Sequence, residues 1–222
     1  MKKKSQKSIF LKSEGNSWYK RNKHDLGKSK MVENDFFIPF INDKNRILEI
    51  GCSNGNNLNY VNSKLPDFNL EMHGVDPSRE AINSGNKMYP DINLQVGTSE
   101  TLDYDDRCFD IVICGNFLYL VDRDLIFRTI SEIDRVLKYG GFLIIVDFDV
   151  PAAYSNNYIH CENVQSYKND YSKFFVGCGH YTIVGKKQFS IKNRYSFHKN
   201  IDERISSTIL YKELIKDVYK IK

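Results

Sequence analysis

The chain has 222 residues, of which 41% are hydrophobic and 27% charged, with a formal net charge of +4. This length is enough for one α/β core, and no apolar run approaches the ~18 residues of a membrane-spanning helix. Five cysteines without a C-x-x-C pair favour reduced thiols, and no apolar signal segment follows the lysine-rich start, so we expect a cytoplasmic protein.

The positive charge is concentrated in residues 1–30. They hold ten lysines and arginines against Glu14 and Asp25, a local net charge of +8, which leaves −4 for the rest. Such an arm can bind nucleic acid or an acidic small molecule, and a solvated terminus is the alternative. No RNA-binding signature accompanies it, so nucleic acid is the less favoured partner. A helix is predicted next, over residues 31–40.

A strand is predicted at residues 47–50, and it runs through Glu49 into a turn that begins at Gly51 and ends at Gly55. Twenty-five residues after Gly51, a second short apolar strand stops at Asp76. The glycines let the backbone turn sharply and approach a ligand. A carboxylate at the tip of the second strand is placed to accept from both ribose hydroxyls. The pattern predicts a unit that binds a ribonucleoside cofactor.

The glycine spacing discriminates among such cofactors. It matches neither the G-x-G-x-x-G of dinucleotide folds nor a P-loop. Glu49, ahead of the first glycine, disfavours phosphate and suits an ammonium or sulfonium cation. Residues 47–55 resemble the first motif of class I S-adenosylmethionine-dependent methyltransferases, with Ser53 in place of a common middle glycine. For this motif alone, an ordinary strand-to-helix turn of another α/β protein is the alternative.

The later elements follow in the order of that family. They are a strand at 92–96, a β-branched strand at 109–114, an amphipathic helix at 124–137 and a strand at 142–147. We expect the helix to end at the glycine pair Gly140-Gly141, after Lys138. Residues 135–146 are similar to the helix-to-strand segment that ends the cofactor half of these methyltransferases. The resemblance covers about residues 46–150.

The resemblance implies a Rossmann-like α/β fold. Its seven-stranded sheet would be mostly parallel, with an antiparallel edge strand and helices on both faces. Two further strands, at 181–185 and 205–210, would pair antiparallel at that edge. Residues 1–40 would form a basic segment with lid helices. Residues 41–222 would form the methyltransferase domain, with an acceptor-binding insertion at about 150–180.

The implied cofactor is S-adenosyl-L-methionine, with S-adenosyl-L-homocysteine as the product. Glu49 would lie near its amino group and Asp76 would hold its ribose. Thr98 stands where the family often has an acidic residue that contacts the adenine amino group, so this contact is left open: a hydroxyl or backbone group of Thr98 or Ser99 is one replacement. The other contacts expected within the domain are Gly51, Cys52, Ser53, Gly55, Pro77, Glu100, Cys114, Asn116 and Phe117.

The segment around the single tryptophan resembles the lid of many small-molecule methyltransferases. Trp18 and Tyr19 would cover the sulfonium, because aromatic ring faces attract a cation. Arg21 would pair with the carboxylate of the methionyl part. A packing aromatic residue and a surface arginine are the alternative.

An aromatic and polar segment follows Pro151 and is expected to bind the methyl acceptor. Its rings, with nearby amides, suit sugars or nucleotides, while a cover over the sheet edge is the alternative. The expected acceptor contacts are Tyr119, Tyr154, Tyr158, Tyr167 and Tyr171. A general base is needed only for a hydroxyl or a protonated amine. His160 is the first candidate and Asp149 and Asp170 the next. The His/Cys pairs near 160 and 180 lack zinc-finger spacing, so no metal is expected.

The pattern looks like small bacterial methyltransferases of surface-polysaccharide or capsule pathways. The leading hypothesis is therefore methylation of an oxygen or nitrogen on a small phosphorylated or nucleotide-linked sugar. One alternative is an RNA methyltransferase, whose binding would weaken steeply with salt. Another is a cofactor-binding module without catalysis, in which Ser53 and Thr98 mark a decayed site. The acceptor atom and the oligomeric state do not follow from the sequence.

Overall fold

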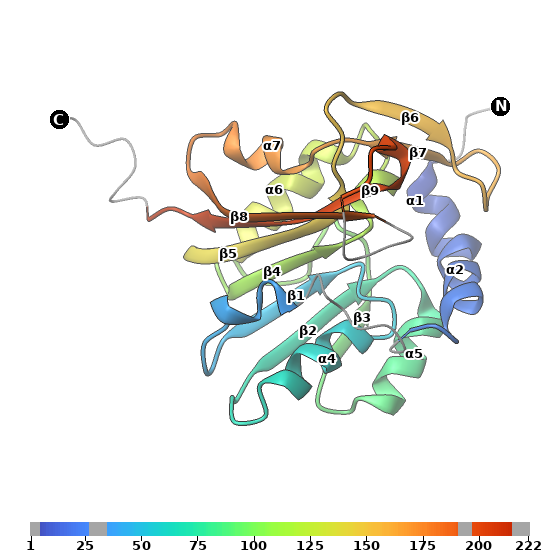
Figure 1. Ribbon diagram of the computed structural model, residues 1–222. Helices are drawn as coiled ribbons and strands as arrows, with labels where there is room; N and C mark the ends of the chain where they lie inside the picture. The colour runs from blue at the N-terminus through green and yellow to red at the C-terminus, as the bar shows by residue number, and fades with distance from the viewer. Residues whose placement is uncertain (1–4, 27–34, 191–196, 215–222) are drawn as a thin grey trace.

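The computed structural model describes residues 5–26, 35–190 and 197–214, and its main element is a seven-stranded sheet (Figure 1). The strand order is β3-β2-β1-β4-β5-β9-β8. Strands β1 to β5 are parallel, and β9 runs antiparallel to both β5 and β8. The strands are β1 Arg46–Ile50, β2 Glu71–Asp76, β3 Asn93–Val96, β4 Phe109–Gly115, β5 Leu137–Phe148, β8 Tyr181–Ser190 and β9 Arg204–Lys212. The predicted fold class is confirmed.

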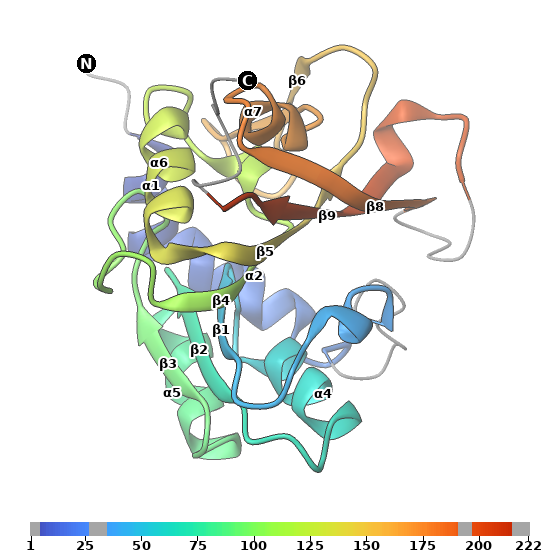
Figure 2. The same ribbon diagram turned by 90° about the vertical axis from the view of Figure 1, so that its left-hand side faces the viewer.

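Helices cover both faces of the sheet, which is why its central strands are continuous apolar runs (Figure 2). Ile47 and Ile113 belong to the core under α4 and α5, while Leu48 and Val112 belong to the core under α6 and α7. Successive residues of a strand point to opposite faces, so each strand serves both cores. These helices are α4 Asn56–Lys64, α5 Arg79–Met88, α6 Ile126–Val136 and α7 Ser172–Val176.

Helix α6 ends earlier than predicted, and the expected glycine C-cap was wrong. Its last carbonyls, at Arg135 and Val136, accept from the backbone amides of Arg107 and Cys108 at 2.7 and 3.0 Å. Leu137 is already extended and pairs with Phe109 at the start of β5. Residues 138–141 therefore belong to the strand. Hydrogen bonds from the preceding loop satisfy the last carbonyls of the helix, so no glycine cap is needed.

The N-terminal segment is helical, not a solvated tail. Helix α1 (Gln6–Ile9), a π-helical turn η1 (Phe10–Glu14) and α2 (Gly15–Asn22) follow one another without a break. They lie at the edge of the sheet where the parallel strands end (Figure 1). Of the helix predicted at 31–40, residues 31–34 fall outside the described part of the chain. In the rest, Asp35 is α-helical and Ile38–Phe40 forms a short 3-10 helix.

Hydrogen bonds fix the N-terminal helix to the domain at two places. The carboxylate of Asp122 accepts from the backbone amides of Gln6 and Lys7, both at 2.8 Å, at the positive end of the helix. Further along, the side-chain oxygen of Asn16 accepts from the hydroxyl of Ser78 at 2.9 Å, at the start of α5. The helix is therefore positioned relative to the ends of β2 and β4.

The segment after β5 forms a small separate hairpin beside the N-terminal helix. Its strands, β6 (Tyr154–Asn157) and β7 (Gln165–Lys168), pair antiparallel. The side chain of Gln6 donates to the carbonyl of Leu120 at 2.6 Å and accepts from the amide of Gln165 at the same distance. The remaining 3-10 turns are Leu118–Leu120 and Ile201–Glu203. Within the described ranges, no helix is both long and apolar enough to span a bilayer.

Candidate functional site

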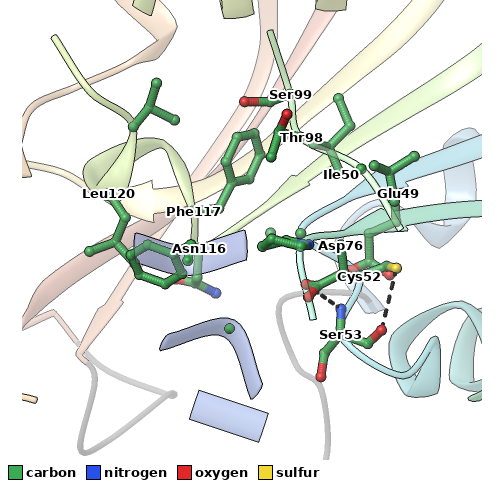
Figure 3. Close-up of a pocket in the computed structure, with 18 of the residues that line it drawn as sticks. Glu49, Ile50, Cys52, Ser53, Asp76, Thr98, Ser99, Asn116, Phe117 and Leu120 are labelled. Atoms are coloured by element: carbon green, nitrogen blue, oxygen red, sulfur yellow. Dashed lines mark hydrogen bonds between the residues drawn. The ribbon is translucent and has the colours of Figure 1, made fainter. Parts of the chain in front are cut away.

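A cavity of about 290 Å³ lies at the carboxyl ends of β1, β2, β3 and β4, beneath the N-terminal helix. Ligands of open α/β sheets bind at this edge. Figure 3 shows Asn116, Phe117 and Leu120 on one side of the cavity and Ser53 and Asp76 on the other. Loops after four strands and one helix therefore converge on a single space.

The glycine turn after β1 forms the floor of this cavity. Gly51 has a φ of +77°, and a Cβ there would lie 3.1 Å from the side chain of Phe117. Ser53 has a φ of +51°, so it adopts the left-handed conformation that a glycine takes more readily. The serine in place of the family's glycine thus leaves the backbone path of a tight turn intact.

Asp76 joins this turn to the second strand. One carboxylate oxygen accepts from the amide of Ser53 at 2.9 Å (Figure 3). The other accepts from the amide of Ser78 at 2.8 Å. Burial raises the pKa of Asp76 to about 6, against the lowering effect of these two bonds. Each carboxylate oxygen can accept more than one hydrogen bond, so both remain available to hydroxyl donors in the cavity.

Glu49 places a second carboxylate in the cavity wall with half of its hydrogen-bonding capacity unused. Its Oε1 accepts from the side-chain amide of Asn57 at 2.7 Å. Its Oε2 is buried and has no partner among the described residues. Burial raises the pKa of Glu49 to about 8, and the nearby Asp76 adds to this effect. A buried acceptor without a donor is costly, so a ligand cation here would be stabilised.

The part of the cavity farther from Glu49 lies between the loop after β3 and the segment after β4. Thr98 donates its hydroxyl proton to Glu100 at 2.7 Å, and the ammonium of Lys7 pairs with the same oxygen of Glu100. Burial alone would raise the pKa of Glu100, but these two contacts outweigh it and hold the pKa below its ordinary value. The walls here are apolar, formed by Phe10, Leu120, Val121 and Leu125.

The structure brings most of the predicted cofactor contacts together. Those that line the cavity are Trp18, Glu49, Gly51, Cys52, Ser53, Asp76, Pro77, Thr98, Ser99, Glu100, Asn116 and Phe117. The other three lie elsewhere. Cys114 is buried in the core of the sheet. Gly55 is the residue before α4 and has a positive φ. The guanidinium of Arg21 donates to Glu14 at 2.5 Å. Arg21 is therefore already paired with a carboxylate of its own helix.

Sequence reasoning missed the start of the N-terminal helix. Lys7, Phe10 and Gly15 line the cavity from α1, η1 and α2. Trp18 lies on the same helix face as these three residues. The step of five residues from Phe10 to Gly15 does not fit a regular α-helix, and the π-helical turn between them accommodates it. A regular helical pattern does not reveal this face.

None of the five predicted acceptor tyrosines lines the cavity. Tyr171 is in the core and its hydroxyl donates to the carbonyl of Tyr167, while Tyr154 donates to Asp202 on the surface. The ring of Tyr119 packs edge-on against Phe148 at 5.1 Å, and the ring of Tyr158 lies 6.4 Å from that of Phe10 in the N-terminal helix. Burial, and then the nearby carboxylate of Glu14, raise the pKa of Tyr158 to about 12, against the lowering effect of Arg21. The buried hydroxyl of Tyr158 lies beside Glu14 and Arg21 but makes no hydrogen bond of good geometry in the described chain.

The three candidate bases have different surroundings. Asp149 and Asp170 both pair with the ammonium of Lys186, at 2.8 and 3.0 Å. His160 is exposed on the β6–β7 hairpin, with its ring edge-on to Tyr158 at 5.3 Å. None of the three lines the cavity. Among the described residues, no cluster of three His, Cys, Asp or Glu side chains could hold a metal ion.

Comparison with known proteins gives a consistent result. Residues 47–141 match the family model of a methyltransferase domain. The putative methyltransferase YqeM of Bacillus subtilis is 22% identical over 79% of this chain and 73% of its own length. The ubiquinone/menaquinone biosynthesis C-methyltransferase UbiE of Geobacter sp. is 29% identical over 50% of the chain. The chain covers 48% of that relative, so it spans about half of its length.

Solved structures show the same fold. A 1,6-didemethyltoxoflavin-N1-methyltransferase of Burkholderia thailandensis, with bound 1,6-didemethyltoxoflavin and S-adenosylhomocysteine, aligns with a TM-score of 0.70 at 13% identity. The alignment covers 93% of this chain and 89% of that one. An S-adenosylmethionine-dependent methyltransferase of Methanosarcina mazei aligns with a TM-score of 0.65 at 18% identity, over 81% and 97% of the two chains.

We expect Asp76→Asn to weaken S-adenosylhomocysteine binding by ~10- to 100-fold, because a charged acceptor for hydroxyl donors is worth about 1.5–3 kcal/mol. Isothermal titration calorimetry measures this change. Asp67→Asn, at an exposed carboxylate, is the matched control and should bind like the wild type. Wild-type affinity in Asp76→Asn would contradict the role given to this carboxylate.

Binding of S-adenosylhomocysteine at pH 7 should release close to one proton per site. With a pKa of about 8, Glu49 is mostly protonated in the free protein, and a ligand ammonium beside it favours the ionised form. Calorimetry in phosphate and in Tris, which differ in ionisation enthalpy, gives the number of protons. Glu49→Gln should abolish the release.

The same raised pKa makes the free wild type lose stability relative to Glu49→Gln as the pH rises from about 4.5 through 8. Chemical unfolding of both proteins across this pH range measures the difference.

Proposed function

We propose that the protein transfers a methyl group from S-adenosylmethionine to an oxygen or nitrogen of a small molecule. The proposal is supported by the match of residues 47–141 to the family model of a methyltransferase domain and by the fold shared with solved methyltransferases. The observation that carries the proposal is the orphaned Glu49 oxygen in the same cavity as Asp76. One suits the amino group of an adenosyl amino acid and the other its ribose. A dinucleotide or a phosphate ester would place anions against Glu49.

Trp18, on the N-terminal helix, and Asn116 and Phe117, after β4, also line the cavity. The rings of Trp18 and Phe117 would stabilise a sulfonium cation. When bound, S-adenosylmethionine supplies a methyl group that is already activated. The protein must then orient the acceptor and exclude water, and the N-terminal helix closes this side of the cavity.

The acceptor would approach between the N-terminal helix and the β6–β7 hairpin. Glu14, in the π-helical turn, is buried there beside the charge of Arg21 and the unpartnered hydroxyl of Tyr158. A π-turn inside a helix frequently marks a functional site, because it redirects side chains. These groups can accept or donate hydrogen bonds to a hydroxyl or an amine. They support an acceptor site next to the cofactor.

The charge of the cavity bears on the class of acceptor. Lys7 is the one cation in the described cavity wall, and it is paired with Glu100. The wall thus offers no free cation to a phosphate. The nucleotide-linked sugar predicted from sequence is supported by the aromatic and amide side chains of the hairpin, but not by charge. We therefore place an uncharged or cationic small molecule ahead of a phosphorylated one.

The two other hypotheses draw less support from the structure. In the described part of the basic arm, Lys7, Lys20 and Arg21 each pair with a carboxylate, which reduces the charge available to RNA. A site that no longer binds the cofactor would be expected to lose the tight turn after β1. Ser53 instead keeps the left-handed backbone, and its amide still binds Asp76.

The function is tested by incubating the protein and S-adenosylmethionine labelled in its methyl group with a low-molecular-weight bacterial metabolite extract, and in parallel with total RNA. We expect label in one or a few small products, identified by mass spectrometry, and none in RNA. Label in RNA alone would support the RNA hypothesis. Binding without transfer in either arm would support the non-catalytic module. Absence of S-adenosylhomocysteine binding would contradict the proposal altogether.

We propose His160 as the general base if the acceptor carries a hydroxyl or a protonated amine, since Asp149 and Asp170 are both paired with Lys186. His160→Ala should then lower turnover of the identified acceptor by ~100-fold or more and leave S-adenosylhomocysteine affinity unchanged. His198→Ala, at another exposed histidine, should change neither. Equal turnover in His160→Ala would remove this residue from the mechanism.

A further inference from the structure

One side-chain amide joins three parts of the chain that are distant in sequence. Gln6, on α1, is 4% exposed. Its Nε2 donates to the carbonyl of Leu120 at 2.6 Å and to the carbonyl of Gln165 at 3.2 Å. Its Oε1 accepts from the backbone amide of Gln165 at 2.6 Å. Both donor positions of this buried amide, and its acceptor oxygen, are therefore bound to backbone groups.

These backbone groups belong to the cavity wall and to the β6–β7 hairpin. Leu120 ends the 3-10 turn after β4 and lines the cavity, as does Lys7, the residue next to Gln6. Gln165 begins β7, whose free edge faces α1 (Figure 1). Because Gln6 binds both the amide and the carbonyl of Gln165, its side chain takes the place of a neighbouring strand at this edge. Gln6 therefore ties the wall to the hairpin.

The hairpin itself does not form the cavity wall. The structure describes all of residues 154–168, and none of them lines the cavity. Any effect of a bound ligand on the hairpin must therefore pass through elements that contact both. Helix α1 and the turn that ends at Leu120 are such elements, and both are bound to β7 through Gln6.

Two other contacts join the wall to the hairpin, and both involve aromatic rings. The ring of Phe10 lies 6.4 Å from that of Tyr158, and the guanidinium of Arg123 lies 4.4 Å from the ring centre of Tyr167. Ring contacts change little when the partners slide by a fraction of an ångström, whereas hydrogen bonds weaken steeply with distance and angle. The bonds of Gln6 therefore fix the hairpin more exactly than the ring contacts do.

We propose that Gln6 is a positioning residue that transmits occupancy of the cavity to the β6–β7 hairpin. A ligand packed against Leu120 and the N-terminal helix restrains both supports of the amide, so the hairpin loses freedom as well. Such coupling is reciprocal, and an acceptor held by the hairpin would strengthen cofactor binding by the same factor. This inference rests on the cofactor and acceptor sites of the proposed function, and goes beyond them in naming the group that links the two.

Hydrogen exchange of the hairpin amides, with and without saturating S-adenosylhomocysteine, measures the coupling. In the wild type, peptides that cover residues 154–168 should exchange at least ~3-fold more slowly when the ligand is bound. Gln6→Met keeps a side chain of similar length but removes every hydrogen bond of the amide. It should still bind the ligand in titration calorimetry, while its hairpin exchanges at the same rate with and without ligand.

Gln165→Ala is the matched control, because it removes a side-chain amide that donates to Asn157 at 2.8 Å but keeps the backbone groups that Gln6 binds. It should retain the ligand-dependent slowing. Gln6→Glu keeps an acceptor for the amide of Gln165 and loses the donors to both carbonyls. It should also lose most of the slowing, and it serves as the test if Gln6→Met does not fold.

The outcomes separate this inference from the proposed function. A purely structural role for Gln6 would speed exchange in its variants with and without ligand and keep the ratio of the two rates. An unchanged ratio would overturn the inference and assign the coupling to Phe10 and Arg123. A wild-type hairpin that does not respond to bound ligand would also overturn it, while the proposed function stands. Failure of the wild type to bind S-adenosylhomocysteine would overturn both.

Discussion

The site depends on the hydrogen bonds that the carboxylate of Asp76 accepts from two backbone amides. The carboxylate accepts from the amide of Ser53 in the first turn and from the amide of Ser78 at the start of α5. A buried carboxylate needs such donors, and here one of the two donors is a backbone amide of the glycine turn itself. The group that would bind ribose thus also shapes the turn that approaches the ligand, so that binding and local folding share one residue.

The N-terminal helix completes the site from outside the sheet. Asp122 binds its first amides, Asn16 binds the start of α5, and Lys7 pairs with Glu100. Its π-turn also directs Glu14 into the interior, toward the hairpin after β5. The helix therefore contacts the cofactor side and the proposed acceptor side at once. If the cofactor binds in this cavity, its enclosure and the shape of the proposed acceptor site would both depend on this helix.

The main strands of the sheet and many of the residues that line the cavity could be predicted from the sequence, because they depend on local signals. A buried parallel strand is an apolar run, and a glycine turn followed by a carboxylate 25 residues later is a short-range pattern. Other features depended on tertiary contacts. The end of α6 is set by amides of the preceding loop, and the positions of Lys7 and Phe10 depend on a π-turn. Asp149 and Asp170 gain their shared partner, Lys186, only through folding.

A crystal structure with S-adenosylhomocysteine tests the central claim most directly. The account predicts that the ribose hydroxyls lie within hydrogen-bonding distance of Asp76, with the amino group beside Glu49. A ligand bound with its ribose away from Asp76, or its amino group away from Glu49, would contradict it.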